Sequence, residues 1–372
     1  MGLKILHINS YYIGNKLYKN LFDQQMNSDL DISVYVPHST SYRGSQDGFG
    51  EYTTLSPVFN DFDRLIFQLK HARILQDVKS KYKMDEYSVI HAHSLFSNGY
   101  IAMKLNQQFK IPYIVTVRNT DIHVFFKYMI HLRKMGIQIL NNAQRVIFLS
   151  SGYRDTLLRE YVPENLKTRI LQKSVIIPNG VDEYWLQNQF EPKIIQHPDH
   201  VKLLYVGTVN KNKNITTTVK AMDCLSDRKI KATLTMVGRV ESKGLFERLI
   251  KSKKVDYITR QSKEELIKIY RQHDILVMPS IHETFGLVYA EAMSQGLPVI
   301  YTRGQGFDRQ FADGVVGYSA NCFDASEIAT AIQKVVNNYP EFSRNCIENS
   351  RVFDWRTIAQ TYTKVLKASE KP

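Results

Sequence analysis

Two glutamates, Glu283 and Glu291, flank a glycine in the segment whose residue types are best suited to chemistry. An apolar run ends at Pro279, and a helix is expected to begin near Phe285–Gly286. The first turn of a helix leaves about four backbone N–H groups without partners, and these carry a partial positive charge. We expect four consecutive residues to present them: Thr284, Phe285, Gly286 and Leu287. Because Gly286 has no side chain to hold a ligand away, the segment predicts a cradle for phosphate.

The two carboxylates would bind what is attached to that phosphate. Glu291 lies about one and a half turns inside the expected helix, where a carboxylate can accept two vicinal hydroxyls of a ribose. Glu283 lies just outside the helix and can accept hydroxyls of a group beyond the phosphates. The alternative is an ordinary loop and helix with two solvated carboxylates, since glutamates are mostly exposed.

The elements that must position this segment alternate between apolar, β-branched runs and amphipathic stretches. Strands are expected at residues 4–9, 32–36, 88–93, 112–117, 145–150 and 174–178, and then at 202–207, 232–238, 255–258, 275–279 and 297–301. Helices are expected at residues 16–26, 100–109, 262–273, 285–295 and 357–368. Alternation of this kind predicts βαβ units around parallel sheets.

A polar stretch with two prolines interrupts the series at about residues 184–200 and is interpreted as a linker. The sequence therefore predicts an N-terminal domain over residues 1–184 and a C-terminal domain over residues 185–352. The last helix, within residues 353–372, is expected to pack back on the first domain. Ligands of doubly wound sheets bind at the loops after the strands.

The segment from Pro279 to Ile300 resembles the signature of the retaining GT-B glycosyltransferases, glycosyltransferase family 4 (group 1). The resemblance lies in Pro-Ser, Glu-x-Phe-Gly, Glu-Ala-Met and Gly-x-Pro-Val-Ile, with seven residues between Glu283 and Glu291. It implies an α/β protein of GT-B fold, with two doubly wound Rossmann-like domains facing across a cleft. The first domain would bind the acceptor and the second a nucleotide sugar, held by Glu283 at its sugar and Glu291 at its ribose.

Weaker matches extend this resemblance over most of the chain. Gly207, Thr208 and Lys213 resemble the family's phosphate loop, in which Thr208 replaces the usual arginine. Arg260 belongs to a segment similar to the one that meets the nucleotide base. Gly14 lies in the first strand-to-helix loop, where family members often carry two or three glycines. The resemblance implies that these residues bind the donor or the acceptor.

Arg118 and Asp121 lie where many family members have a histidine and a later aspartate. A permanent cation at Arg118 can stabilise charge on the leaving phosphate or bind an acceptor phosphate, but it cannot act as a general base. Both residues are predicted as catalytic. The alternative is a structural pair between Arg118 and Asp121.

No metal is expected. His91 and His93 share one face of a strand, but two histidines fall short of the three or four ligands of a zinc site. By resemblance, this pair lines the cleft. Asp61 and Asp63 are expected to open a helix over residues 64–75, where acidic residues complement the helix dipole.

The charge balance is strongly basic, with 49 Lys plus Arg against 36 Asp plus Glu and a formal net charge of +13. Residues 101–150 hold seven of these cations and one acid. Within them, residues 124–135 are interpreted as an aromatic and basic helix that can lie on an anionic membrane; the alternative is a core helix with a solvated basic face. Three cysteines without a CxxC pair, a short N-terminal apolar run and no apolar stretch of ~18 residues indicate a cytoplasmic protein, peripheral at most.

The resemblance implies a retaining hexosyltransferase that uses a UDP-sugar and builds a surface polysaccharide or glycolipid on a lipid-linked or glycan acceptor. Its usual mechanism is a front-face displacement in which the departing phosphate deprotonates the acceptor, without a cofactor or metal. Three alternatives remain open: a GDP-mannose donor, a soluble acceptor, or a non-catalytic module that binds nucleotide sugar or nucleic acid. Nucleic acid is not expected as the partner.

Overall fold

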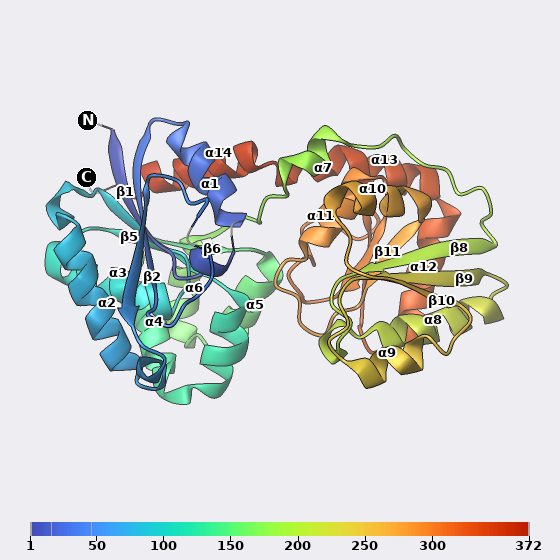
Figure 1. Cartoon of the computed structure of the whole chain (residues 1–372), viewed down its shortest axis with the longest axis horizontal. Coiled ribbons are helices and arrows are strands. Elements are labelled where there is room, and N and C mark those ends of the chain that lie inside the picture. Colours follow the sequence, from blue (N-terminus) through green and yellow to red (C-terminus); the bar gives the residue numbers. More distant parts are fainter. Residues whose placement is uncertain (1, 16, 46, 371–372) are drawn as a thin grey trace. The chain divides into compact units, whose positions relative to one another are not determined.

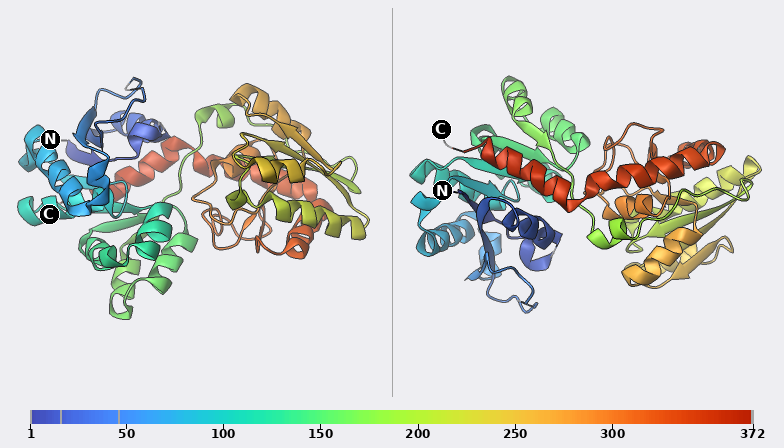
Figure 2. Two further views of the ribbon diagram at one scale, coloured as in Figure 1. Left: turned by 60° about the horizontal axis from the view of Figure 1, so that its bottom comes forward. Right: turned by 90° about the horizontal axis from the view of Figure 1, so that it is seen from above.

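A computed structural model describes residues 2–15, 17–45 and 47–370, which form two compact units (Figures 1 and 2). The first unit contains the chain up to Leu149, Tyr153–Pro178 and the chain from Trp355 onward. The second contains Ser150–Gly152 and Asn179–Asp354. Apart from Ser150–Gly152, the second unit therefore begins at Asn179, five residues before the end predicted for the first domain.

The first unit is built on a seven-stranded parallel sheet with the strand order β3-β2-β1-β4-β5-β6-β7. Its strands are β1 Leu3–Ile8, β2 Leu30–Ser39, β3 Thr53–Phe59, β4 Val89–Ala92, β5 Tyr113–Val117, β6 Arg145–Phe148 and β7 Ser174–Ile176. The apolar runs of β4 and β5 are buried along their whole length, as expected for a parallel sheet covered on both faces. The edge strand β3 was not predicted, because it is largely half-exposed and contains Pro57, which is tolerated only at a sheet edge.

Helices cover both faces of this sheet (Figure 1). They are α1 Leu17–Met26, α2 Phe67–Lys81, α3 Ser97–Phe109, α4 Arg133–Asn142, α5 Ser151–Glu160, α6 Glu164–Gln172 and α14 Trp355–Lys367. On one face, α14 packs beside α1, and Trp355, Ile358 and Tyr362 join a buried cluster with Ile5 and Phe22. The C-terminal helix is therefore part of the first unit.

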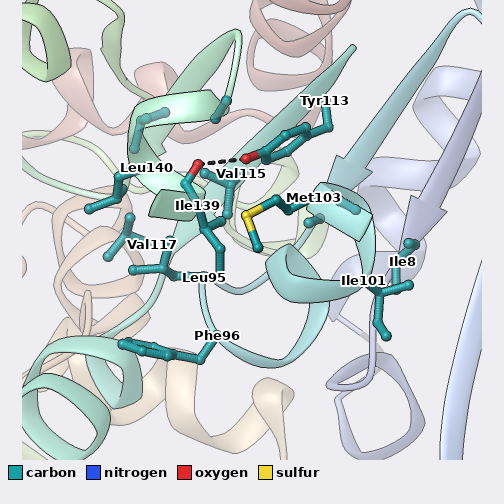
Figure 3. Close-up of a cluster of buried hydrophobic side chains, with 14 of the residues drawn as sticks. Ile8, Leu95, Phe96, Ile101, Met103, Tyr113, Val115, Val117, Ile139 and Leu140 are labelled. Carbon is teal, nitrogen blue, oxygen red and sulfur yellow. Dashed lines mark hydrogen bonds between the residues drawn. The ribbon is translucent and has the colours of Figure 1, made fainter. Parts of the chain in front are cut away.

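The other face carries the larger core of the first unit (Figure 3). Phe96 and Met103 of the α3 region pack there with Val115 and Ile139. The hydroxyl of Tyr113 is buried with them and donates a hydrogen bond of 2.7 Å to the carbonyl of Ile139. The polar atom of a buried tyrosine is thus satisfied, and the sheet is tied to α4.

The helix predicted over residues 124–135 is wrong. The chain forms a π-helical turn (η4, Asp121–Phe126), breaks at Met129, and continues as a 3₁₀ turn (η5, Ile130–Leu132) into α4. Phe126 and Leu132 are both buried, and the break lets each reach the core. Nε of Arg133 donates to the Phe126 carbonyl at 2.6 Å, which satisfies an acceptor that the broken helix would leave open.

Asp61 and Asp63 stabilise local structure, as the sequence indicated, although the helix begins differently. A 3₁₀ turn (η2, Phe62–Leu65) precedes α2. The carboxylate of Asp63 accepts the N–H of Asn60 at 2.9 Å and pairs with Arg73 at 2.7 Å. Asp61 accepts the hydroxyls of Ser39 and Ser41.

The second unit has a six-stranded parallel sheet in the order β10-β9-β8-β11-β12-β13. Its strands are β8 His200–Val206, β9 Lys231–Val237, β10 Val255–Ile258, β11 Ile275–Met278, β12 Val299–Thr302 and β13 Gly317–Ala320. Its helices are α7 Glu183–Gln187, α8 Ile215–Asp227, α9 Lys243–Leu249, α10 Lys263–Gln272, α11 Leu287–Ser294, α12 Ala325–Asn337 and α13 Tyr339–Ser350. In both units the strand order reverses next to the first strand, which is the switch point where ligands of such sheets bind.

The stretch interpreted as a linker, residues 184–200, contacts the second unit at its start and is mostly exposed from Phe190 onward. It begins within α7, and the N–H of Phe190 then donates to the carbonyl of Ser294 at 3.0 Å. The side chain of Gln189 donates to the Ile347 carbonyl at 3.0 Å. The start of the stretch is therefore anchored to α11 and α13, and the polar composition of the rest fits its exposure to solvent.

Within the described part of the chain, every helix is too short or too polar to cross a bilayer. The three cysteines, Cys224, Cys322 and Cys346, are free thiols.

Candidate functional site

The loops that follow β8 and β11 are joined by one residue, Asn212. Its side-chain amide donates to the carbonyl of His282 at 2.9 Å, and its side-chain oxygen accepts the N–H of His282 at 3.1 Å. Its own carbonyl accepts the N–H of Ile281 at 2.8 Å. Three hydrogen bonds therefore fix these two loops to each other at the switch point of the second sheet.

These hydrogen bonds of Asn212 bring Lys213 next to Glu283. The ammonium of Lys213 lies 2.6 Å from Oε2 of Glu283, and the two side chains are 20% and 12% exposed. The hydroxyl of Ser280 lies 3.2 Å from the same carboxylate oxygen. The side chain of Asn210 accepts the backbone N–H of Lys213 at 3.1 Å, which fixes the backbone of Lys213. A cation and a carboxylate thus stand together, partly accessible to solvent.

The loop after β12 supports Glu283 from the other side. The side chain of Gln305 accepts the N–H of Glu283 at 3.0 Å, and the N–H of Gly306 donates to the Glu283 carbonyl at 3.0 Å. A Cβ at Gly306 would lie 1.9 Å from the carbonyl oxygen of Thr284, so only glycine allows this approach. Both the backbone N–H and the carbonyl of Glu283 are therefore held by hydrogen bonds.

The start of α11 lies next to this loop. Gly286 is the N-cap residue, with φ +75 and ψ +70, a left-handed conformation that favours glycine. The amides at the helix start belong to Gly286, Leu287 and Val288, so Thr284 and Phe285 lie in the preceding loop and not in the first turn as predicted. Phe285 is buried and packs edge-on against Phe353 at 5.5 Å, which anchors the loop.

Glu291 lies in the second turn of α11 and is half-buried. Burial raises its pKa to about 7, and a hydrogen bond of 3.2 Å from the hydroxyl of Tyr270 opposes that rise. Tyr270 is itself buried and packs edge-on against Trp185 at 5.5 Å. Near neutral pH this carboxyl group is therefore poised between its charged and neutral forms.

The remaining predicted residues of the second unit lie in the loops after β8 and β10. The N–H of Gly207 donates to the carbonyl of Val237 at 2.8 Å, and a Cβ at Gly238 would lie 2.0 Å from the Gly207 carbonyl oxygen. Thr208 is half-buried, and its carbonyl accepts the hydroxyl of Tyr205 at 2.8 Å. Arg260 is exposed.

Three predicted residues, Gly14, Arg118 and Asp121, belong to the first unit, and the other ten belong to the second. The Asp121 carboxylate accepts the backbone N–H groups of Leu95, Phe96 and Arg118 at 3.0, 3.1 and 2.8 Å. Burial raises the pKa of Asp121 to about 6, against the opposing effect of these donors. Asp121 therefore holds the loop before α3 in place.

Arg118 and Gly14 have different surroundings in that unit. Arg118 is buried, its Nε donates to the carbonyl of His93 at 3.1 Å, and its guanidinium lies 5.2 Å from the ring centre of Tyr18. Gly14 ends the 3₁₀ turn η1 (Tyr12–Gly14) and is exposed, and no described residue lies within 4 Å of an added Cβ. Neither residue is held by the contacts that surround Glu283.

His91 and His93 do not line a cleft, and that expectation is wrong. Both rings are fully buried inside the first unit, and burial lowers the pKa of each well below its ordinary value.

Sequence reasoning missed the residues that hold the site together. Asn212 and Gln305 join three loops, and Tyr270 reaches Glu291 from α10. Asn212 immediately precedes Lys213, and Gln305 lies between two glycines, but their pairing depends on loops about 70 and 22 residues apart in the chain. Only the folded sheet brings such residues together.

Two family models cover most of the chain. The model described as "Glycosyltransferase Family 4" matches residues 19–184, and the model described as "Glycosyl transferases group 1" matches residues 187–353. The chain therefore belongs to the group 1 glycosyltransferases of family 4. This result agrees with the sequence signature around Glu283 and Glu291.

Relatives within this family are distant in sequence. An uncharacterized glycosyltransferase of Methanocaldococcus jannaschii is 27% identical over 284 residues, which is 74% of each chain. A D-inositol 3-phosphate glycosyltransferase of Paenarthrobacter aurescens is 25% identical over 327 residues, 82% of this chain and 75% of that protein.

Solved structures establish the GT-B fold. The sucrose-phosphate synthase of Thermosynechococcus elongatus superposes with a TM-score of 0.73 at 20% identity, covering 99% of this chain and all of that one. The lipopolysaccharide outer core galactosyltransferase WaaB gives 0.74 at 14% identity, covering 98% and 99% of the two chains. Anabaena HepE, solved in complex with UDP-glucose, gives 0.66 at 16% identity over 98% of this chain and all of that chain.

Proposed function

We propose that the protein is a retaining glycosyltransferase that transfers a hexose or an N-acetylhexosamine from a UDP-sugar to a lipid-linked or polysaccharide acceptor. The observation that carries the proposal is the partly exposed pair of Lys213 and Glu283, fixed at the switch point beside the start of α11. A cation, a carboxylate and helix amides together offer what a sugar diphosphate needs.

Different residues of the second unit would bind different parts of the donor. Lys213 and the amides of Gly286 and Leu287 would bind the diphosphate, and Glu291 would accept the ribose hydroxyls. Glu283 would accept hydroxyls of the transferred sugar. In the free protein Lys213 and Glu283 form an ion pair with each other. A bound donor would replace this ion pair with two contacts, one between its phosphate and Lys213 and one between its sugar hydroxyls and Glu283. Gly207, Thr208 and Arg260 would contact the donor around this centre.

Transfer with retention needs no carboxylate pair of the hydrolase kind. The bond between the anomeric carbon and the phosphate oxygen breaks, and the acceptor oxygen forms its bond to the same face of that carbon. The acceptor proton passes to the departing phosphate, which leaves as part of UDP. Lys213 and the helix amides would stabilise the negative charge that grows on that phosphate, without a metal or cofactor; the catalytic role predicted for Arg118 stays a prediction.

A membrane-linked acceptor is supported by the surface of the first unit. The side chains of Tyr128 and Ile130 are 68% and 65% exposed, and Lys127 and Lys134 are exposed beside them in the chain. Exposed aromatic and aliphatic groups among cations suit an anionic lipid surface. We infer a peripheral protein on the cytoplasmic face of a membrane, acting in capsule, exopolysaccharide or other cell-surface glycan synthesis.

A soluble acceptor is the second candidate. One relative is named a D-inositol 3-phosphate glycosyltransferase and one structural neighbour a sucrose-phosphate synthase, names that refer to small phosphorylated molecules. The basic net charge of +13 suits such an acceptor as well. The donor can differ too, with GDP-mannose in place of a UDP-sugar.

A two-step experiment tests the proposal. The full chain is screened against UDP-, GDP- and ADP-sugars by thermal shift, since a ligand of the native state raises the melting temperature. The best donor is then incubated with anionic vesicles carrying polyprenyl phosphate or with soluble phosphorylated sugars, and the product anomer is determined by NMR. A UDP-sugar with vesicles and retained configuration is expected. An inverted anomer, or no stabilisation by any nucleotide sugar, would overturn the proposal.

A further inference from the structure

Three histidines meet inside the first unit, one more than the sequence pattern suggested. His7 of β1 and His91 of β4 are register partners on neighbouring parallel strands, and His93 follows two residues after His91. Side chains at such positions point to the same face of a sheet. One ring nitrogen from each histidine lies within 4.8 Å of the other two, and all three side chains are fully buried.

Two of these nitrogens lie close enough together to share an ion. Nδ1 of His7 lies 3.0 Å from Nε2 of His93. Two nitrogens bound to tetrahedral zinc at about 2.0–2.1 Å lie about 3.4 Å apart. A shift of a few tenths of an ångström would therefore turn this contact between two ring nitrogens into two bonds to one ion.

His91 would supply the third ligand of the ion. Its Nε2 lies 2.9 Å from the hydroxyl of Thr116, whereas its Nδ1, like Nε2 of His7 and Nδ1 of His93, is buried and has no hydrogen-bond partner among the described residues. Metal-bound histidines commonly use their second nitrogen in this way, to fix the tautomer and the ring orientation. A buried nitrogen without a partner is costly, and a bound ion would satisfy it.

The surroundings indicate which ion would bind. An all-imidazole donor set suits zinc, copper or nickel, and it does not suit magnesium or calcium, which require oxygen ligands. The rings of Phe22 and Tyr18 in α1 and Tyr362 in α14 lie 5.0–5.6 Å from those of His7, His93 and His91, respectively. An ion here would tie two strands together beneath two helices, so its role would be structural.

We propose that His7, His91 and His93 bind one divalent transition-metal ion, with Zn²⁺ as the simplest case, and that this ion stabilises the first unit. The positive charge of Arg118, whose Nε binds the His93 carbonyl, opposes a dication, so ligation must exceed that repulsion. The proposal is independent of the donor site, because all its residues belong to the first unit.

The test compares metal binding by the full chain and by two matched variants. Protein is stripped with a chelator, then titrated with Zn²⁺ or Co²⁺ alone, and the bound metal, the Co²⁺ absorption and the melting temperature are measured. We expect about one equivalent bound, and a rise in melting temperature of roughly 5 °C or more at a hundredfold excess over the dissociation constant. His93→Gln should lose both effects.

His71→Gln is the control, because His71 is also buried but lies outside the cluster, stacked on Phe67. It should bind metal like the parent chain. Should His93→Gln fail to fold, X-ray absorption of the Zn²⁺-loaded parent chain decides, with three imidazole nitrogens at about 2.0 Å expected. Substoichiometric metal without a rise in melting temperature, or equal binding by His93→Gln, would show a purely hydrogen-bonded histidine cluster and overturn the proposal.

Discussion

The two units treat the charged groups at the carboxyl ends of their central strands differently. In the second unit, Lys213 and Glu283 pair through their side-chain ends while remaining partly exposed, and it is their backbones that the neighbouring loops hold. In the first unit, the side chains of Arg118 and Asp121 are buried, and the carboxylate of Asp121 is occupied by three backbone amides. The difference indicates that charge in the second unit is available to a ligand, whereas much of the charge in the first maintains the fold.

The largest effect is expected from Glu283→Gln. Loss of this charge removes a group that would act on the transferred sugar, so donor turnover should fall about a hundredfold or more, as for other preorganised electrostatic groups. Release of UDP without acceptor measures it. Glu265 is an exposed glutamate that pairs with Lys268 at the surface, so Glu265→Gln is the matched control and its turnover should be unchanged. Equal activity of both variants would remove Glu283 from the mechanism.

Asp121→Asn should give the opposite pattern, with lost stability and a smaller loss of turnover. An amide accepts on one oxygen only, so at least one of the three backbone donors loses its partner, at about 1–3 kcal/mol of unfolding free energy. Urea denaturation measures this change. A stable variant with strongly reduced turnover would instead assign Asp121 to catalysis.

UDP affinity should depend on pH through Glu291. Its pKa is raised to about 7 in the folded protein, so the carboxylate that would accept ribose hydroxyls is present above pH 7 and protonated below it. Affinity should therefore fall about tenfold between pH 8 and pH 6 by calorimetry. Glu291→Gln should bind weakly and equally at both values. A dependence that persists in Glu291→Gln would place the titrating group elsewhere.

The raised pKa of Glu291 should also affect stability, in the direction opposite to its effect on UDP affinity. Because the folded pKa lies above the ordinary value of 4.5, the folded state holds the proton more tightly than the unfolded state. This group's contribution to the unfolding free energy should therefore decline as pH rises from about 4.5 to 7, and Glu291→Gln should lack that slope in chemical denaturation.

Gly14→Ala should have the smallest effect. The residue is exposed, and an added Cβ meets no described residue within 4 Å, so the unfolding free energy should change by about 0.5 kcal/mol or less. The assay that matters is turnover. Unchanged turnover would show that no ligand approaches this backbone closely, and a clear loss would support its predicted role.

Much of the architecture could be predicted because the central strands are contiguous apolar runs, and the signature around Glu283 and Glu291 lies in one continuous segment. The edge strands β3 and β13 were missed, since one is half-exposed with a proline and the other, Gly-Tyr-Ser-Ala, contains no β-branched residue. The break at Met129 depends on the side chain of Arg133 reaching back to a carbonyl, which no local pattern reveals.

The candidate site shows the same division. The family resemblance pointed to Lys213, but the roles of Asn212 and Gln305 arise only when three strand ends meet. Likewise, His91 and His93 gave an incomplete ligand set until β1 placed His7 beside them. Which residues lie together in each site is decided by contacts between segments distant in the chain, and these contacts depend on strand order.

The central claim is that Lys213, held against Glu283 at the start of α11, binds the diphosphate of the donor. Calorimetric titration of UDP into the parent chain, Lys213→Gln and the surface control Lys268→Gln tests it directly. The account predicts at least about tenfold weaker binding for Lys213→Gln and unchanged binding for Lys268→Gln. Equal affinity of all three proteins for UDP would contradict it.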